Sequence, residues 1–325
     1  MNTIISLIRP RVLSSVNNLR HGNRKNGWSR IFMFGTMGLV FWIGIFIIFY
    51  RVLLYFHSVQ DFGDILAMKL ISMTIITFFM LLIFSNIINC LSHLYLSQDL
   101  PLVHSLPVEA KDIFLSRWII STFDSSWMIL AFSLPIFLSY GIIYKANVMY
   151  YLIFLTVMIF MCLIASALSG FAVLFGAKIL PAGRIRTIMI IMGVVMVIIL
   201  VLILRLTRPE QLVNPDSFAS VVLYLNSLQT PSSPVLPTTW VTDAIKGALY
   251  SETKTSLLNT GLTVTFAFML IFLNSLFARK MYFGGFSKSL TTPGRLFAPL
   301  KYKGFDWENL LNFLSRESKA FAVKE

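Results

Sequence analysis

Charge is scarce in this sequence. Asp, Glu, Lys and Arg make up 13% of the 325 residues, whereas 57% are hydrophobic. A soluble domain carries roughly 25% charged residues. The apolar residues come in long blocks instead of stripes with a 3.6-residue period, which indicates that lipid surrounds them. The composition excludes an ordinary soluble domain and predicts an all-α, polytopic membrane protein.

Cysteine and metal-binding patterns are also scarce. The two cysteines, Cys90 and Cys162, both lie within apolar blocks and form no CxxC pair. Buried thiols of this kind behave as small apolar groups. Cys90 and His93 are spaced to begin a metal site on a helix, but no further ligand lies near them in the sequence. We therefore expect no metal site.

The motifs of several enzyme classes are missing. The chain contains no GxxxxGK[ST] pattern for a nucleotide phosphate, no HExxH and no GxSxG. No helix with paired acids faces a membrane cavity. These absences predict a non-catalytic chain without a cofactor of its own.

Six blocks are long enough to cross about 30 Å of hydrocarbon, which takes about 20 helical residues. The predicted spans are Ile31–Phe56, Ile65–Leu96, Trp118–Tyr144, Val148–Ala177, Thr187–Leu206 and Leu257–Phe277. Together they form a six-span module over residues 31–278. A cytoplasmic tail follows at residues 279–325 and contains many basic residues.

The net charge of +13 comes from basic residues in the short segments between spans. This distribution is not that of a nucleic-acid-binding domain. With both termini on one side, 20 Lys and Arg residues fall in segments on that side and six on the other. By the positive-inside rule, both termini are expected to face the cytoplasm.

Residues 1–30 form a basic amphipathic segment. Ile4, Ile8 and Val12 recur at helical spacing, with arginines on the other faces, which predicts an interfacial helix that faces anionic headgroups. Pro10 predicts a kink or a later start. A disordered basic tail is the alternative.

The connection at residues 207–255 is predicted to be helical and to cover the outer mouth. Its second half places Trp240, Val241 and Ile245 on one face of a helix that Thr238 or Thr239 would cap. A flexible loop is the alternative.

Polar residues in the third span are candidates for function, because charge is costly inside a bilayer. Asp124 shares one helical face with Arg117, Ser121 and Ser125. Asp124 is expected either to hold helices together through a polar or basic partner or to line a transport path.

The inner loop at residues 97–117 interrupts two spans with mixed charge and two Leu-Pro pairs. Pro107 suits the first turn of a short helix, "VEAKDIF", parallel to the membrane. Such a helix, held between two long spans, would serve as a lever that receives motion.

The stretches "DLPLVHSLPVEAKDIFLSRW", "SSWMILAFSLPIFLSYG" and "SSPVLPTTWVTDAIKG" resemble the permease subunits of ABC-2-type exporters of bacterial plasma membranes. The resemblance implies a six-span permease that pairs with a second module and transports its substrate when a separate cytoplasmic ATPase subunit hydrolyses ATP. It also implies that the ATPase docks on the inner loop. Leu106 and Val108 would make the apolar contact, Glu109, Lys111 and Asp112 would form its rim, and Leu100, Pro107 and Phe114 belong to the same surface.

Two other functions are compatible with the sequence. A secondary transporter driven by an ion gradient would use Asp124, and would be expected to show further charges deep in its spans. A non-transporting membrane scaffold or assembly factor is the other alternative.

Overall fold

The computed structural model describes residues 2–21, 24–58, 63–97, 99–179 and 233–291, together with six positions between 194 and 205. The described part is helical and contains no strand. Five of its helices are long and apolar enough to cross a membrane: Gly35–Ser58, Gly63–Leu96, Ala110–Ile143, Val148–Ala177 and Thr253–Phe286. The prediction of an all-α polytopic membrane protein is confirmed. The predicted span Thr187–Leu206 lies largely outside the described residues.

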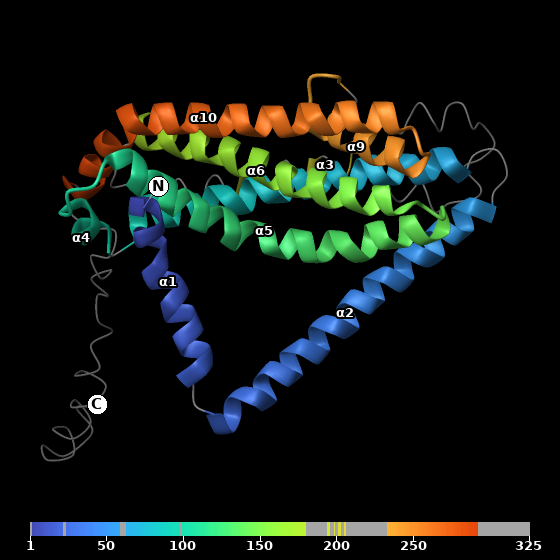
Figure 1. The fold of residues 1–325 in the computed structure, drawn as a ribbon, viewed down its shortest axis with the longest axis horizontal. Helices are drawn as coiled ribbons and strands as arrows, with labels where there is room; N and C mark the ends of the chain where they lie inside the picture. Colours follow the sequence, from blue (N-terminus) through green and yellow to red (C-terminus); the bar gives the residue numbers. More distant parts are fainter. Residues whose placement is uncertain are drawn as a thin grey trace, which may run out of the picture.

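Four long helices form a bundle: α3 (Gly63–Leu91), α5 (Ala110–Ile143), α6 (Val148–Ile179) and α10 (Thr253–Thr291). They lie side by side along one axis (Figure 1). A shorter helix, α9 (Pro237–Leu249), packs between α10, α6 and α3. The core consists of large apolar side chains and tyrosines from all of these helices.

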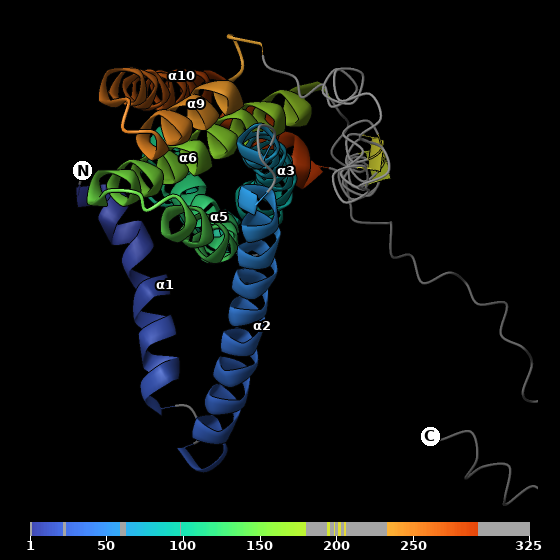
Figure 2. The same cartoon turned by 90° about the vertical axis from the view of Figure 1, so that its right-hand side faces the viewer.

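Two helices leave the bundle. Figures 1 and 2 show α1 (Asn2–His21) running across the bundle axis at one end, and α2 (Arg24–Ser58) running obliquely from the far end of α1 to the opposite end of the bundle. The helix α1 continues through Pro10, so it has no later start. Because α2 begins at Arg24, the last residues of the predicted 1–30 segment belong to α2.

Small residues allow α6 to approach its neighbours closely. A Cβ on Gly170 would lie 3.3 Å from Trp118 and 3.4 Å from the Asn274 amide. Ala165, Ser166 and Ser169 are fully or almost fully buried beside it. Without side-chain bulk, helix backbones in a membrane approach closely and pack well.

The outer connection differs from its prediction in position and cap. The helix α9 exists, but Leu236 is its N-cap residue, no side chain caps it, and Pro237 opens its first turn. Neither Thr238 nor Thr239 is the cap. Because α9 buries Val241, Ala244 and Ile245 against the bundle, it is part of the bundle. The first half of residues 207–255 lies outside the described residues.

The ends of α3 and α10 also differ from the sequence prediction. A π-helical turn, η1 (Ser92–Leu96), follows α3 directly. The helix α10 reaches Thr291, so the predicted tail at 279–325 begins as a continuation of that helix, and residues 292–325 lie outside the described part.

Candidate functional site

The short helix of the inner loop is α4 (Leu100–His104), which has a proline in its first turn. The first-turn position of Pro107 had predicted this helix at "VEAKDIF" instead. Those residues form an extended pair, Val108 and Glu109, followed by the first turns of α5, with Glu109 as the N-cap. No residue between Ala110 and Trp118 breaks the helix, so this segment joins the long span.

The predicted docking residues differ in how far their side chains are exposed to solvent. Leu100 and Phe114 are buried in the core, at 1% and 0% exposure, and therefore present no surface. Val108 is half-buried and packs against the core. The surface of the loop consists of Leu102, at 70% exposure, and Leu106, at 46%. Pro107 and Glu109 are exposed beside them, and Lys111 and Asp112 are half-buried.

An ion pair fixes the segment that contains α4, residues 99–108 (the α4 loop), to α5. Arg117 on α5 donates to the carboxylate of Asp99, which also accepts a hydrogen bond from Ser97. Burial raises the pKa of Asp99, but the hydrogen bonds from Ser97 and Arg117 and the guanidinium charge outweigh it and leave the pKa below its ordinary value. The Arg117 side chain is 12% exposed and that of Asp99 50%, so the pair is shielded from water on the arginine side only.

Aromatic rings fix the same loop to α10. The imidazole of His104 stacks on Phe286 with ring centroids 3.7 Å apart and an interplanar angle of 8°. It also contacts Tyr282, which packs against Phe114 of α5. The Nδ1 of His104 lies 2.9 Å from the carbonyl oxygen of Leu100. Movement of α4 would therefore be passed directly to α5 and to the end of α10.

A second polar cluster joins α1 to the bundle. Arg11 Nη2 donates to Asp124 Oδ2 at 2.7 Å, and His93 Nε2 lies 3.1 Å from the same oxygen. Arg11 Nη1 lies 3.2 Å from His93 Nδ1. Because a guanidinium only donates, Nδ1 must accept, so Nε2 carries the proton and donates to Asp124. His93 is thus neutral in this arrangement, and it lies in the wide turn η1.

The other predicted polar residues of α5 face inward. Ser125 is buried and accepts a hydrogen bond from the Asn89 amide at 2.7 Å. Ser121 is fully buried, and its hydroxyl has no partner among the described residues. Asp124 is 37% exposed beside them. Thus the predicted face divides into a buried Ser–Asn contact between α3 and α5 and an ion pair at its edge.

Trp240 lies on α9, away from both clusters. Its indole N–H donates to the carbonyl of Pro234 at 2.7 Å, and its ring contacts Phe266 of α10 edge to face. These contacts hold the entry to α9 against α10.

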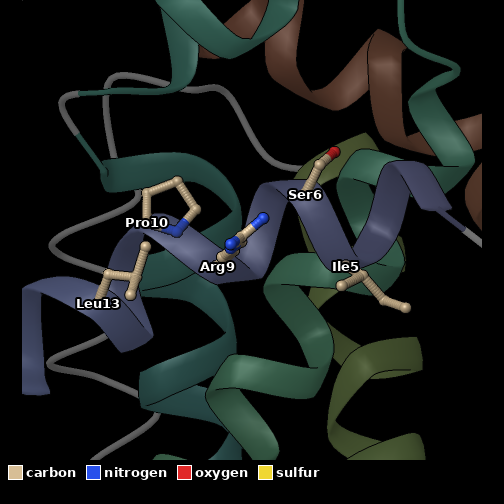
Figure 3. Close-up of a pocket in the computed structure, with 5 residues that line it drawn as sticks. All are labelled: Ile5, Ser6, Arg9, Pro10 and Leu13. Carbon is tan, nitrogen blue, oxygen red and sulfur yellow. The ribbon is translucent and has the colours of Figure 1, made fainter.

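A groove along α1 carries a free basic group. It is lined by Ile5, Ser6, Arg9, Pro10 and Leu13 (Figure 3). Arg9 has no ion-pair partner among the described residues. A basic group beside apolar side chains, on a helix that crosses the bundle axis, fits a position at the membrane surface.

Metal ligands do not gather in the described part of the chain, where no three His, Cys, Asp or Glu residues form a group that could hold an ion. Cys90 is buried in the core.

The fold defines a polytopic, all-α membrane protein with a structured loop at one end of its bundle. Residues 23–320 match the model of the family described as "Putative ATP-binding cassette". The chain belongs to that family. The match covers nearly the whole chain and implies an ABC transport system with partner components. No curated protein and no solved structure matches the chain.

The family match corrects two predictions. The resemblance to ABC-2-type exporters predicted a non-catalytic permease subunit, with ATP hydrolysis on a separate partner. A match to an ATP-binding cassette overturns both the permease assignment and the expectation that the chain is non-catalytic. The resemblance to ABC-2-type exporters and the expected absence of a cofactor stay predictions.

ATP is the ligand that this family description implies, and the described residues do not fit its triphosphate. No Gly-Lys pair occurs anywhere in the chain, although the phosphate-binding loop of ATP-binding proteins depends on one. Arg11 and Arg117 are each paired with an acid, and Arg279 and Lys280 are exposed on α10. We therefore derive no step of ATP chemistry through these helices.

Some important residues were missed from the sequence. Leu102 and His104 precede the segment that was taken as the helix, and Asp99 looked like an ordinary loop acid. The sequence offered one indication of the position of the short helix, a proline in its first turn. Pro101 fits that position as well as Pro107 does. The contact between His104 and Phe286 joins residues 182 positions apart, and no local pattern reports it.

Proposed function

We propose that this chain is a membrane-spanning component of an ABC transport system in a bacterial plasma membrane, with both termini in the cytoplasm. In this proposal, the exposed face of the α4 loop is the surface on which another component of that system binds.

The connection of the α4 loop to two separate spans is the observation that carries the proposal. Asp99 ties the loop to Arg117 of α5, and His104 ties it to Phe286 of α10. Two exposed leucines, Leu102 and Leu106, project from the same loop. Exposed leucines on an otherwise fixed loop at the end of a bundle suit contact with a partner component.

The orientation rests on charge. The 20 cations on one side against six on the other support a cytoplasmic position for α1, the α4 loop and the end of α10. The α4 end of the bundle is then the end that a cytoplasmic component would reach.

The test is a purification of the tagged chain from its host in mild detergent, followed by mass spectrometry and an ATP hydrolysis assay in liposomes. We expect Leu102→Asp with Leu106→Asp to lower partner recovery, and ATP hydrolysis by the recovered assembly, at least about tenfold, because two buried leucine contacts are worth several kcal/mol. Val235→Asp is the matched control, since Val235 is 77% exposed and lies just before α9, outside the α4 loop.

Hydrolysis is measured for the chain alone and for the recovered assembly. Partner recovery and assembly-dependent hydrolysis that are lost in the double variant support the proposal. Partner recovery and hydrolysis that survive in the double variant would contradict the role of the α4 loop.

A further inference from the structure

Three polar side chains from different elements meet where α1 joins the bundle. His93 of η1 has Nδ1 3.2 Å from Arg11 Nη1 and Nε2 3.1 Å from Asp124 Oδ2. The same carboxylate oxygen accepts a hydrogen bond from Arg11 Nη2 at 2.7 Å. Arg11, His93 and Asp124 therefore form a closed triangle of contacts between α1, η1 and α5, which we call the α1 clasp.

The α1 clasp requires a neutral imidazole. A neutral imidazole has one N–H donor and one acceptor nitrogen, and Nδ1 of His93 is the acceptor because the guanidinium of Arg11 can only donate. A proton on Nδ1 would leave two donors and two positive charges facing each other at 3.2 Å. The single carboxylate of Asp124 would then be shared by two cations.

Arg11 is the member of the clasp that can leave. Its side chain is 44% exposed, whereas that of His93 is 16% exposed and belongs to a turn that continues α3 directly. A charged donor also makes a stronger hydrogen bond, so protonated His93 keeps its contact with Asp124. Leu7 of α1 packs against the apolar core as well, so loss of the clasp loosens α1 without removing all of its contacts.

The other ionisable groups around η1 do not take the place of Arg11. Arg117 of α5 is paired with Asp99 of the α4 loop, and its positive charge also opposes a proton on His93. From α10, Tyr282 donates its hydroxyl to a main-chain carbonyl of η1. Within this set, Asp124 is the group that favours the proton, against two arginines and the partial burial of the imidazole.

We propose that the α1 clasp is a proton-operated latch, which holds α1 against α5 while His93 is neutral and releases it when His93 binds a proton. Histidine changes its charge between about pH 5 and pH 8, so the latch responds to pH in the compartment that α1 faces. Its contribution to stability is present at the upper end of this range and is lost as the pH falls, because only the neutral imidazole accepts from Arg11. The latch does not depend on a partner at the α4 loop.

Hydrogen exchange of the full chain in phosphatidylcholine nanodiscs, corrected for the intrinsic rate, tests the latch at about pH 8 and about pH 5. In the wild type, opening of α1 should increase about fivefold at the lower pH, which is the effect expected for one exposed ion pair. The protection of α6 should not change. A free carboxyl group titrates at about pH 4, so Asp124 stays charged over this range.

Two variants should remove the pH response in opposite ways. His93→Gln should keep α1 closed at both pH values, because an amide offers one donor and one acceptor and carries no charge. Arg11→Gln should leave α1 open at both values. His104→Gln is the matched control and should keep the response of the wild type, because His104 lies in α4 and stacks on Phe286 of α10.

Nitrogen NMR of isotope-labelled histidine reads the state of the imidazole directly, with the His93 signal assigned by its loss in His93→Gln. At about pH 8 we expect the neutral tautomer with its proton on Nε2. The opposite tautomer, or a His93 that is already charged at that pH, overturns the proposal.

Two results of the exchange experiment also overturn the latch. One is an opening of α1 that is the same at both pH values in the wild type. The other is a pH response that persists in His93→Gln while α6 remains protected. A variant that fails to fold is recognised by lost protection of α6, and the wild-type exchange and the tautomer then decide the outcome.

Discussion

The helices α2 and α6 are almost equally apolar but differ in their surroundings. Their most apolar windows have mean hydropathies of 2.3 and 2.6, yet 6% of that window is buried in α2 and 61% in α6. The difference lies in what the small residues meet: in α6, Ala165, Ser169 and Gly170 are buried against neighbouring helices, whereas an added Cβ on Gly38 of α2 meets nothing within 4 Å, and Met37 and Val40 beside it are exposed. Hydropathy identifies a span, but the crossing of helices decides which small residues become packing contacts.

The largest effect is expected from filling the contact at Gly170. Gly170→Leu should destabilise the bundle by about 3 kcal/mol, because its side chain would overlap Trp118 and the Asn274 amide. Thermal unfolding in detergent measures the loss. Gly38→Leu in α2 is the matched control, because a Cβ there meets nothing within 4 Å. Equal losses at the two glycines would mean that α2 is packed as closely as α6.

A matched pair of tryptophans tests the same difference through hydrogen bonds. The indole of Trp118 donates to Ser166 O in α6, and that of Trp42 in α2 donates to Ala131 O, both at 3.1 Å. Trp118→Phe should cost about 2 kcal/mol, since Trp118 is buried and the change leaves a cavity. Trp42→Phe should cost about 1 kcal/mol or less. Chemical unfolding of the two variants decides the order, and the reverse order would contradict the comparison.

Five of the predicted spans agree with helices of the structure, because a block of about 20 apolar residues has few alternatives. The contacts of α6 also follow from local spacing: Ala165 and Ser169, or Ser166 and Gly170, are four residues apart. The position of α4 did not follow, because both Pro101 and Pro107 suit the first turn of a helix. Only the tertiary contacts of Asp99 with Arg117 and of His104 with Phe286 select the first.

The ion-pair partners of Asp124 and Asp99 could not be predicted from the sequence for a related reason. Asp124 shared a helical face with Arg117, yet its partners are Arg11 and His93, which lie 113 and 31 residues away. Arg117, which lies on the same helical face as Asp124, forms its ion pair with Asp99 instead. Helical spacing shows which groups share a face, but only the crossing of helices decides which groups meet.

A smaller effect is expected where α1 joins the bundle. Arg11→Gln removes the ion pair with Asp124, and the two groups are 44% and 37% exposed, so the loss should be about 1 kcal/mol or less. Hydrogen exchange should show faster opening of α1 and unchanged protection of α6. The double variant with Asp124→Asn should add little further loss, because the same pair is already broken. Arg9→Gln, on the groove side of α1, is the control and should leave exchange unchanged.

The smallest effect concerns the other ion pair of α5, within the bundle. The pKa of Asp99 is lower in the folded protein than its ordinary value of 3.8. Its contribution to loop stability is therefore present above pH 3.8 and is lost as the pH falls through the folded pKa. Hydrogen exchange of residues 99–108, corrected for the intrinsic rate, should show opening of the α4 loop over that acidic range. Arg117→Gln should remove this acid dependence. If the variant kept it, another acid would hold the loop, and the ion pair would not be the link that joins α4 to α5.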